Sequence, residues 1–353
     1  MSLTLVTGGT GFLGRHLVAR LVRDGRTVRV LARASSDVTG LVGCEIVRGD
    51  ITSPDDLRRA LAGVTRVFHC AAETRDGRSA DEYRRANVDA VESLLVLAHE
   101  LGVQRVVHTS SYFAIGRTGP PRSAEGFVAD EYWTHDPGDF HGEHERSKDD
   151  AEHQVNQHVS QSEPVVALMP SMIYGPELRP VRDAAGLSPG NRIVRMLADH
   201  AAGRYGALPG DGRQQWNLVH VEDVAAGHVL VMDAEDPAAP GGKGKWPPPR
   251  WTHWHYMLGG ENVAVAQMWA AFAELTGTQP PKAGGGLFKK LFGGAAAPAR
   301  DPERAAMDAH SWAYSSAMAA ADFGYRARPF REGLDQTVQW MQASGLLGSG
   351  GAR

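Results

Sequence analysis

Residues 7–14 read TGGTGFLG, with glycines at every third position from Gly8 to Gly14. The segment directly follows an apolar run at 3–6 and opens an amphipathic segment at 11–23. A chain that turns sharply from strand to helix here can bring its backbone N–H groups close to a pyrophosphate, at the positive end of the helix dipole. A glycine trio alone could serve any tight strand–helix turn. Its place at the start of a strand–helix–strand unit predicts a dinucleotide site.

The residues that this site is expected to contribute are Gly8, Gly11, Phe12, Leu13 and Gly14. The pattern continues for about half of the chain, as short runs rich in Val, Ile and Leu alternate with longer amphipathic segments. The apolar runs lie at 3–6, 27–31, 44–47, 66–70, 103–108 and 164–169, and the amphipathic segments at 11–23, 80–101 and 143–159. This alternation predicts an α/β fold of the Rossmann type, a doubly wound parallel sheet with helices on both faces.

The second half of the chain is less regular. Its expected elements are helices at 187–202, 221–233, 264–276 and 331–345 and a strand at 255–258. A length of 353 residues suggests about two domains. We expect a cofactor domain at 1–177 plus 213–233, a smaller discontinuous substrate domain at 178–212 plus 234–345, and a disordered tail at 346–353.

Two stretches interrupt that second half. Residues 240–251 are dense in Pro, Gly and Trp. The aromatic side chains Trp246, Trp251, Trp254 and Tyr256 crowd this part of the chain and could pack between the domains or line a substrate cage. Residues 284–298 are rich in Gly and Ala around LFKKLF, which fits a flexible loop, a mobile lid or a membrane-surface foot.

Composition excludes several classes of protein. With 37 basic and 41 acidic residues the net charge is −4, which gives no electrostatic case for a nucleic acid partner. Two cysteines, Cys44 and Cys70, cannot build a disulfide framework and favour a reducing compartment. No apolar stretch approaches the ~20 residues of a transmembrane helix, and no secretory signal is recognisable, so a cytoplasmic location is expected.

The end of the second apolar run indicates which dinucleotide binds. An NAD site typically places Asp or Glu there, whereas this run ends in Arg33, Ser35 and Ser36, whose guanidinium and hydroxyl groups suit a 2′-phosphate. The alternative is an ordinary surface arginine. We therefore predict NADP, with NAD less favoured. Asp50 and Ile51 are expected near the adenine, and the small residues Ala71 and Ala72 allow the backbone to approach the cofactor.

Further motifs resemble the extended short-chain dehydrogenases/reductases of the NAD-dependent epimerase/dehydratase superfamily. They are HCAA at 69–72, NV at 87–88, TSS at 109–111, YGP at 174–176 and VHVEDVA at 219–225. LGGENV at 258–263 and YSS at 314–316 resemble the dihydroflavonol-reductase-like branch. The resemblance implies that Pro170 and Ile173 border the cofactor. It also implies a homodimer formed through the segments 80–101 and 143–159.

In this family a Ser or Thr, a Tyr and a Lys four residues after the Tyr carry out the chemistry. The resemblance assigns these roles to Ser111, with Ser110 as the alternative, and to Lys148. The tyrosine position holds His144 instead. Residues 144 and 148 are one helical turn apart, so both side chains share one face.

A histidine changes the proton chemistry, because a phenol has an ordinary pKa near ~10 and an imidazolium one near ~6.5. The Lys148 ammonium favours a neutral imidazole, which suits oxidation of an alcohol, whereas NADP normally goes with reduction. A water relay through Ser111 would reconcile the two. Alternatively the role is lost or belongs to Tyr112, His141 or Tyr174. His141 and His144 have no third potential ligand at a sequence spacing typical of metal sites, so no metal is predicted.

Substrate-contacting candidates are Tyr112, Tyr174 and Trp216. Sugar-nucleotide epimerases of the superfamily carry a diphosphate-binding arginine where this chain has Trp216, although Arg179 or Arg213 could substitute. An indole suits a flat apolar pocket.

We predict an NADP-dependent oxidoreductase that interconverts a ketone and a secondary alcohol on a hydrophobic small molecule. The alternatives are an epimerase, dehydratase or isomerase that retains NAD(P), and a non-catalytic NADP sensor.

Overall fold

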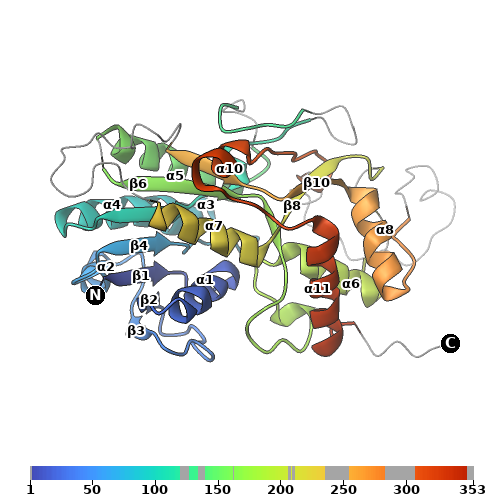
Figure 1. Cartoon of the computed structure of the whole chain (residues 1–353), viewed down its shortest axis with the longest axis horizontal. Helices are drawn as coiled ribbons and strands as arrows, with labels where there is room; N and C mark the ends of the chain where they lie inside the picture. Colours follow the sequence, from blue (N-terminus) through green and yellow to red (C-terminus); the bar gives the residue numbers. More distant parts are fainter. Residues whose placement is uncertain are drawn as a thin grey trace.

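A seven-stranded parallel sheet forms the centre of the computed structural model, in the order β3-β2-β1-β4-β5-β6-β9 (Figure 1). The structure describes residues 2–119, 127–133, 140–161, 163–205, 208, 211–234, 254–282 and 307–347. The strands are β1 (Leu3–Thr7), β2 (Thr27–Ala32), β3 (Glu45–Arg48), β4 (Arg66–His69), β5 (Arg105–Thr109), β6 (Val165–Pro170) and β9 (His255–Leu258). The predicted doubly wound Rossmann sheet is confirmed.

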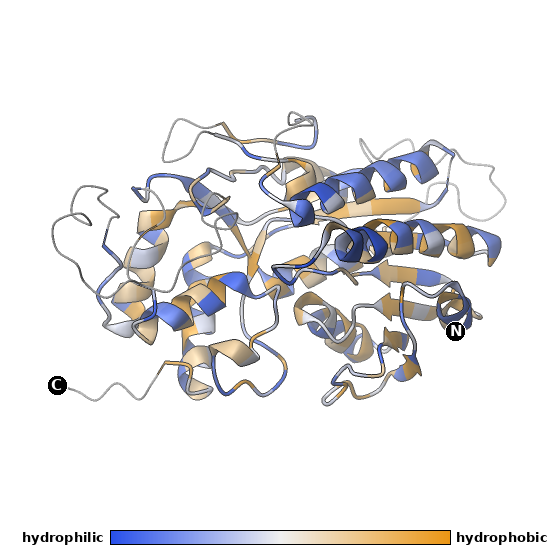
Figure 2. Cartoon of the chain, turned by 180° about the vertical axis from the view of Figure 1, so that it is seen from behind, coloured by the Kyte–Doolittle hydropathy of each residue, from blue (hydrophilic) through white to orange (hydrophobic). Residues whose placement is uncertain are grey.

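Helices cover both faces of this sheet because successive strand side chains point to opposite faces and both sets are apolar. On one face α1 (Phe12–Arg23) and α7 (Val221–Asp233) pack on alternate strand residues such as Val6 and Val107. On the other face α2 (Pro54–Leu61), α4 (Ala90–Glu100) and α5 (Glu143–Ser160) pack on the neighbouring residues, including Leu5. Figure 2 shows largely hydrophobic strands between helices of mixed hydropathy.

The segment expected as one helix at 80–101 begins with α3 (Ala80–Arg84), passes through a π-helical turn at Arg85–Asp89, and continues as α4. A capping box fixes its start, since Ser79 and Glu82 satisfy each other's backbone N–H groups. The π turn widens the helix where Asn87 points inward, and such turns often accompany functional sites.

A smaller sheet of order β10-β8-β7 forms the second lobe. Its strands are β7 (Met172–Tyr174), β8 (Gln215–His220) and β10 (Glu261–Ala264), and the helices that pack against them are α6 (Arg192–Ala201), α8 (Val265–Thr276) and α11 (Phe330–Ala343). The short helix α10 (Ala317–Phe323) packs instead against β9 of the large sheet. Three buried indoles, Trp216, Trp269 and Trp312, fill the core of the second lobe. Along the described part of the chain, no helix has the length and apolarity to cross a membrane.

Three strands lie in a different sheet from the one that the expected domain ranges imply. β7 and β8, both expected within the cofactor domain, pair with each other, and β8 also pairs with β10. β9, expected within the substrate domain, runs parallel to β6 and completes the large sheet. The chain therefore crosses between the two lobes more often than the expected ranges allow. These crossings could not be predicted, because a short apolar run such as β9 does not indicate which strand it pairs with.

The helix expected at 187–202 was placed too early. Residues 184–186 form a short 3₁₀ turn, and α6 begins only at Arg192. Pro189 and Gly190 oppose helix in between, since proline lacks an N–H and glycine has the larger backbone entropy to lose. The stretches 240–251 and 284–298 lie outside the described residues.

Candidate active site

A pocket of about 650 Å³ runs along the carboxyl ends of β1, β2, β4 and β5 and continues under the second lobe. Ligands of open α/β sheets bind at this edge. Of the predicted cofactor residues, all line it: Gly8, Gly11, Phe12, Leu13, Gly14, Arg33, Asp50, Ile51, Ala71, Ala72, Lys148, Pro170 and Ile173. Sequence reasoning therefore located one continuous crevice.

The glycine turn at the floor of the pocket has no space for side chains. Gly8 has φ +71°, and a Cβ there would lie 2.6 Å from the backbone nitrogen of Ala71. A Cβ at Gly14 would lie 2.1 Å from the Gly8 carbonyl oxygen. The N-terminus of α1, capped by Gly11, carries no acidic residue in its first turn. These features fit the pyrophosphate of a dinucleotide.

Two arginines hold the loop that follows β2, where an adenosine ribose would lie. Arg48 donates to the carbonyl oxygens of Arg33 and Ser36 at 2.8 and 3.0 Å. Arg15 is buried and donates to the carbonyls of Thr10, Asp37 and Thr39, which ties this loop to the glycine turn. Their guanidinium groups thus fix the backbone while the Arg33 side chain stays exposed at the pocket.

At the other end of the crevice, Lys148 lines the pocket from α5 and is itself buried. Burial lowers the pKa of Lys148 to about 8, while Glu152 and Cys70 act in the opposite direction. The group remains mostly an ammonium at neutral pH. A buried cation therefore lines the same pocket as Ala71, Ala72 and Pro170.

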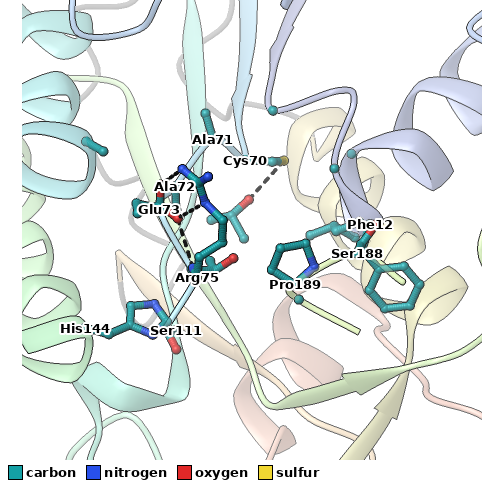
Figure 3. Close-up of a pocket in the computed structure, with 18 of the residues that line it drawn as sticks. Phe12, Cys70, Ala71, Ala72, Glu73, Arg75, Ser111, His144, Ser188 and Pro189 are labelled. Carbon is teal, nitrogen blue, oxygen red and sulfur yellow. Dashed lines mark hydrogen bonds and ion pairs between the residues drawn. The ribbon is translucent and has the colours of Figure 1, made fainter. Parts of the chain in front are cut away.

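Ser111 and His144 line the same end of the pocket, where Figure 3 shows them close together. Lys148 lines this pocket too, so all three residues of the predicted trio border one space. Ser111 caps the short turn Tyr112–Ala114 by accepting a hydrogen bond from the Phe113 N–H at 3.2 Å. The His144 ring lies against two aromatic rings, Tyr83 and Phe113. Ser110 also lines the pocket, and its buried hydroxyl has no protein partner among the described residues.

Of the three substrate candidates, only Tyr112 lines the pocket. Tyr174 is buried and donates to the Phe330 carbonyl at 3.1 Å, and burial raises its pKa, which makes its hydroxyl a weaker acid. Trp216 is 1% exposed and its indole N–H donates to the His310 carbonyl. Neither Tyr174 nor Trp216 lines the pocket, because a strand position next to a motif does not show which face its side chain occupies.

Of the remaining alternatives, His141 and Arg213 lie outside the pocket lining, whereas Ser110 and Arg179 line it. His141 faces His310, with ring centroids 4.9 Å apart. Burial, Arg117 and His310 lower the pKa of His141 to about 4. Arg213 pairs with Asp211 at 2.8 Å. Over the described ranges, no three metal-ligating side chains gather.

Sequence reasoning missed a group of lining residues that border the space beside Ser111 and His144. They are Glu73, Arg75, Tyr83, Phe113, Met172, Arg192, Ile193 and Met307. None belongs to a catalytic motif. Tyr83 could have been noticed because it precedes the NV motif by one helical turn, but nothing in the sequence shows that Met307 reaches the pocket.

The charges at this pocket are largely compensated. Arg75 bonds Glu73, with one of these hydrogen bonds 2.9 Å long, and Arg179 lies 3.5 Å from the Glu177 carboxylate. Arg192 forms an ion pair with Asp308. Arg15 adds a longer contact of 3.7 Å to Asp37. A cation already paired with a carboxylate offers little extra attraction to an anionic ligand.

Comparison with known proteins agrees with this geometry. A family model described as the NAD dependent epimerase/dehydratase family matches residues 4–243. Sterol demethylase protein B of Methylococcus capsulatus is 34% identical over 285 residues, 79% of this chain and 76% of that protein. A putative dihydroflavonol 4-reductase of Synechocystis sp. is 29% identical over 356 residues, 97% and 95% of the two chains. The structure of MoeE5 in complex with UDP-glucuronic acid and NAD is similar, with TM-score 0.70, 26% identity and coverage of 97% and 99%.

The Rossmann sheet, the glycine turn and the trio at its edge define an NAD(P)-dependent oxidoreductase of the extended short-chain dehydrogenase/reductase type. The chain belongs to the NAD-dependent epimerase/dehydratase family. The predicted family is therefore confirmed.

Proposed function

We propose that this protein is an NADP-dependent ketoreductase that interconverts a ketone and a secondary alcohol on an uncharged, hydrophobic small molecule. The observation that carries this proposal is the convergence of Ser111, His144 and Lys148 at one end of a dinucleotide crevice. When bound, the nicotinamide supplies or accepts the hydride at the carbinol carbon.

The residues of the trio divide the remaining work. The Ser111 hydroxyl donates a hydrogen bond to the substrate oxygen and fixes its position. His144 delivers the proton to that oxygen in reduction and removes it in oxidation. The Lys148 ammonium holds the ribose and so fixes the nicotinamide relative to the substrate.

Selectivity for NADP rests on the loop after β2. No carboxylate occupies the first position after the strand, where Arg33 stands and lines the pocket. A guanidinium binds a phosphate more strongly than a ribose hydroxyl because the hydrogen bonds are charge-assisted. Arg48 and Arg15 hold the loop backbone and leave the Arg33 side chain for the 2′-phosphate.

An uncharged substrate is supported by the compensated charges beside Ser111 and His144. The diphosphate of a sugar nucleotide would have to displace Glu73, Glu177 or Asp308 from its arginine. The wall formed by Phe113, Met172 and Met307 suits apolar carbon instead. Relatives named for sterol demethylation and dihydroflavonol reduction also point to ring-containing hydrophobic substrates.

A second candidate, an epimerase that retains the cofactor, is favoured by the similarity to MoeE5 with its bound sugar nucleotide. The two functions differ in net cofactor turnover. We would incubate the protein with NADPH and either 2-decalone, a neutral bicyclic ketone, or UDP-glucose, and follow absorbance at the NADPH band. We expect NADPH consumption with 2-decalone only. Conversion of UDP-glucose without net NADPH consumption would establish the epimerase instead.

A further inference from the structure

His144 lies in the first turn of a helix, an unusual position for a residue that must transfer a proton in a defined direction. It is the second residue of α5, and the helix N-cap, Gly142, provides no side-chain cap. First-turn residues of a helix lack part of the backbone bonding that holds later turns. An imidazole is also shorter than the phenol that the family places here. Other contacts must therefore define where its ring nitrogens point.

The ring is enclosed by aromatic side chains from two other elements. Tyr83 of α3 stacks on His144, with centroids 5.3 Å apart and planes only 9° from parallel. Phe113 of the turn after β5 meets it edge to face, at 5.4 Å and 87°. Rotation of the imidazole about its Cβ–Cγ bond would drive its edge into the Tyr83 ring. Stacking thus restricts the plane in which the proton is presented.

Tyr83 is in turn fixed in place. It is 4% exposed, and its hydroxyl donates to the Arg75 carbonyl at 2.7 Å. The backbone of His144 is tied as well, because the Ser147 hydroxyl donates to its carbonyl at 2.8 Å. Asn87 donates to Ser147 Oγ at 2.9 Å and also bonds the backbone of Glu73. The loop after β4, the π turn and α5 are therefore cross-linked around one histidine.

We propose that Tyr83 and Phe113 are positioning residues that hold the His144 imidazole in the orientation needed for proton transfer, an inference that rests on the proposed function of His144. Tyr83 acts through its ring face and not through its hydroxyl. Phe113 links this orientation to Ser111, because its backbone N–H donates to the Ser111 hydroxyl oxygen. The same turn thus places both groups that address the substrate oxygen.

The test compares Tyr83→Leu with Tyr83→Phe, which keeps the ring and loses only the hydroxyl. Initial rates of 2-decalone reduction by NADPH are measured over a range of substrate concentrations in the wild-type and His144→Ala backgrounds. Misplacing a reacting group by about 1 Å costs roughly 10²-fold, so we expect Tyr83→Leu to lower kcat by about ten- to hundredfold with KM nearly unchanged. Tyr83→Phe, which keeps the stacked ring and loses only the bond to the Arg75 carbonyl, should lower the rate far less than Tyr83→Leu does. Tyr83→Leu should add nothing in the His144→Ala background. Phe272→Leu, a buried change in α8 outside the pocket lining, controls for general destabilisation.

Equal losses from Tyr83→Leu in both backgrounds would overturn the inference, as would an equal loss from Tyr83→Phe. Full activity of His144→Ala would instead overturn the proposed role of His144. A readout without substrate is the NMR signal of the His144 ring, assigned by its absence in His144→Ala. We expect Tyr83→Leu to remove the ring-current shift and Tyr83→Phe to keep it. An unchanged signal in Tyr83→Leu would contradict the stacking itself.

Discussion

At the scale of single residues, the candidate cofactor site contains both side chains that line the pocket and side chains that hold the backbone around it. Arg33 was predicted from its place at the end of β2, and it does line the pocket there. Arg15 and Arg48, which hold the backbone around it, are not part of any motif that sequence reasoning used. The sequence thus indicated that Arg33 lies at the pocket, and the structure adds Arg15 and Arg48, which hold the backbone of its loop.

We expect Arg33→Ala to weaken NADPH binding by about ten- to hundredfold, because it removes charge-assisted hydrogen bonds worth about 1.5–3 kcal/mol. NADH has no 2′-phosphate, so its affinity should change by less than about twofold by the same argument. Fluorescence titration of both cofactors measures the difference. An equal loss for NADPH and NADH would show that Arg33 supports the loop and does not read the phosphate.

At the scale of elements, the Rossmann half was predictable because its signals are local. The alternating apolar runs and the glycine turn give β1, α1 and β2 within a residue or two of their observed bounds. The partners of β8 and β9 were not predictable, since pairing depends on contacts between segments far apart in the sequence. The same reason explains the misplacement of Trp216, whose neighbour Trp312 lies almost a hundred residues away.

The glycine turn allows a matched pair of substitutions. Gly8 and Gly25 have nearly the same φ, +71° and +74°, but a Cβ at Gly8 meets backbone atoms at 2.6 Å, whereas one at Gly25 meets nothing within 4 Å. Both alanine variants should lose about 1–2 kcal/mol for the left-handed conformation. We expect only Gly8→Ala to lose further stability and to abolish NADPH binding, as measured by urea unfolding and calorimetry. Equal stability and equal NADPH binding of the two variants would contradict the close contact between Gly8 and the backbone that follows β4.

Three histidines in the strands and helix beneath the pocket predict a loss of stability in acid. Burial lowers the pKa of His69 to about 3 and of His228 to about 4, and it holds that of His108 well below its usual range. The unfolded chain binds these protons near pH ~6.5, so the stabilisation is complete above that pH and is lost as the pH falls toward 4.

Each of these histidines contributes a slope of up to about 1.4 kcal/mol per pH unit in that window. Urea unfolding between pH 7.5 and 4.5 measures the total. His108→Phe, which has no proton to bind, should flatten the curve. A pH-independent free energy of unfolding would contradict the neutral buried state.

At the scale of the whole molecule, both lobes contribute residues to the pocket lining. The large sheet supplies the glycine turn and the trio, while Pro189, Ile193 and Met307 cover the crevice from segments that follow β7. Residues so far apart in the chain meet only in the folded state. All residues predicted to hold the cofactor line this pocket, whereas of the three residues predicted to contact substrate only Tyr112 does. Their roles stay predictions.

A ligand that binds this crevice contacts both lobes and should stabilise the molecule as one unit. At a concentration of 100 times Kd, NADPH is expected to add about 2.7 kcal/mol to the free energy of unfolding. Thermal unfolding with and without NADPH measures this effect in a single transition. Stabilisation of one transition and not of a second would show that the lobes unfold independently.

The most direct test of the central claim is calorimetric titration of the wild-type protein with NADPH and, separately, with NADH. The account predicts one site per chain and binding of NADPH at least about tenfold tighter than that of NADH, the difference expected for one charge-assisted contact to the 2′-phosphate. Binding of neither cofactor would contradict the whole functional account, and tighter binding of NADH would contradict the role of Arg33.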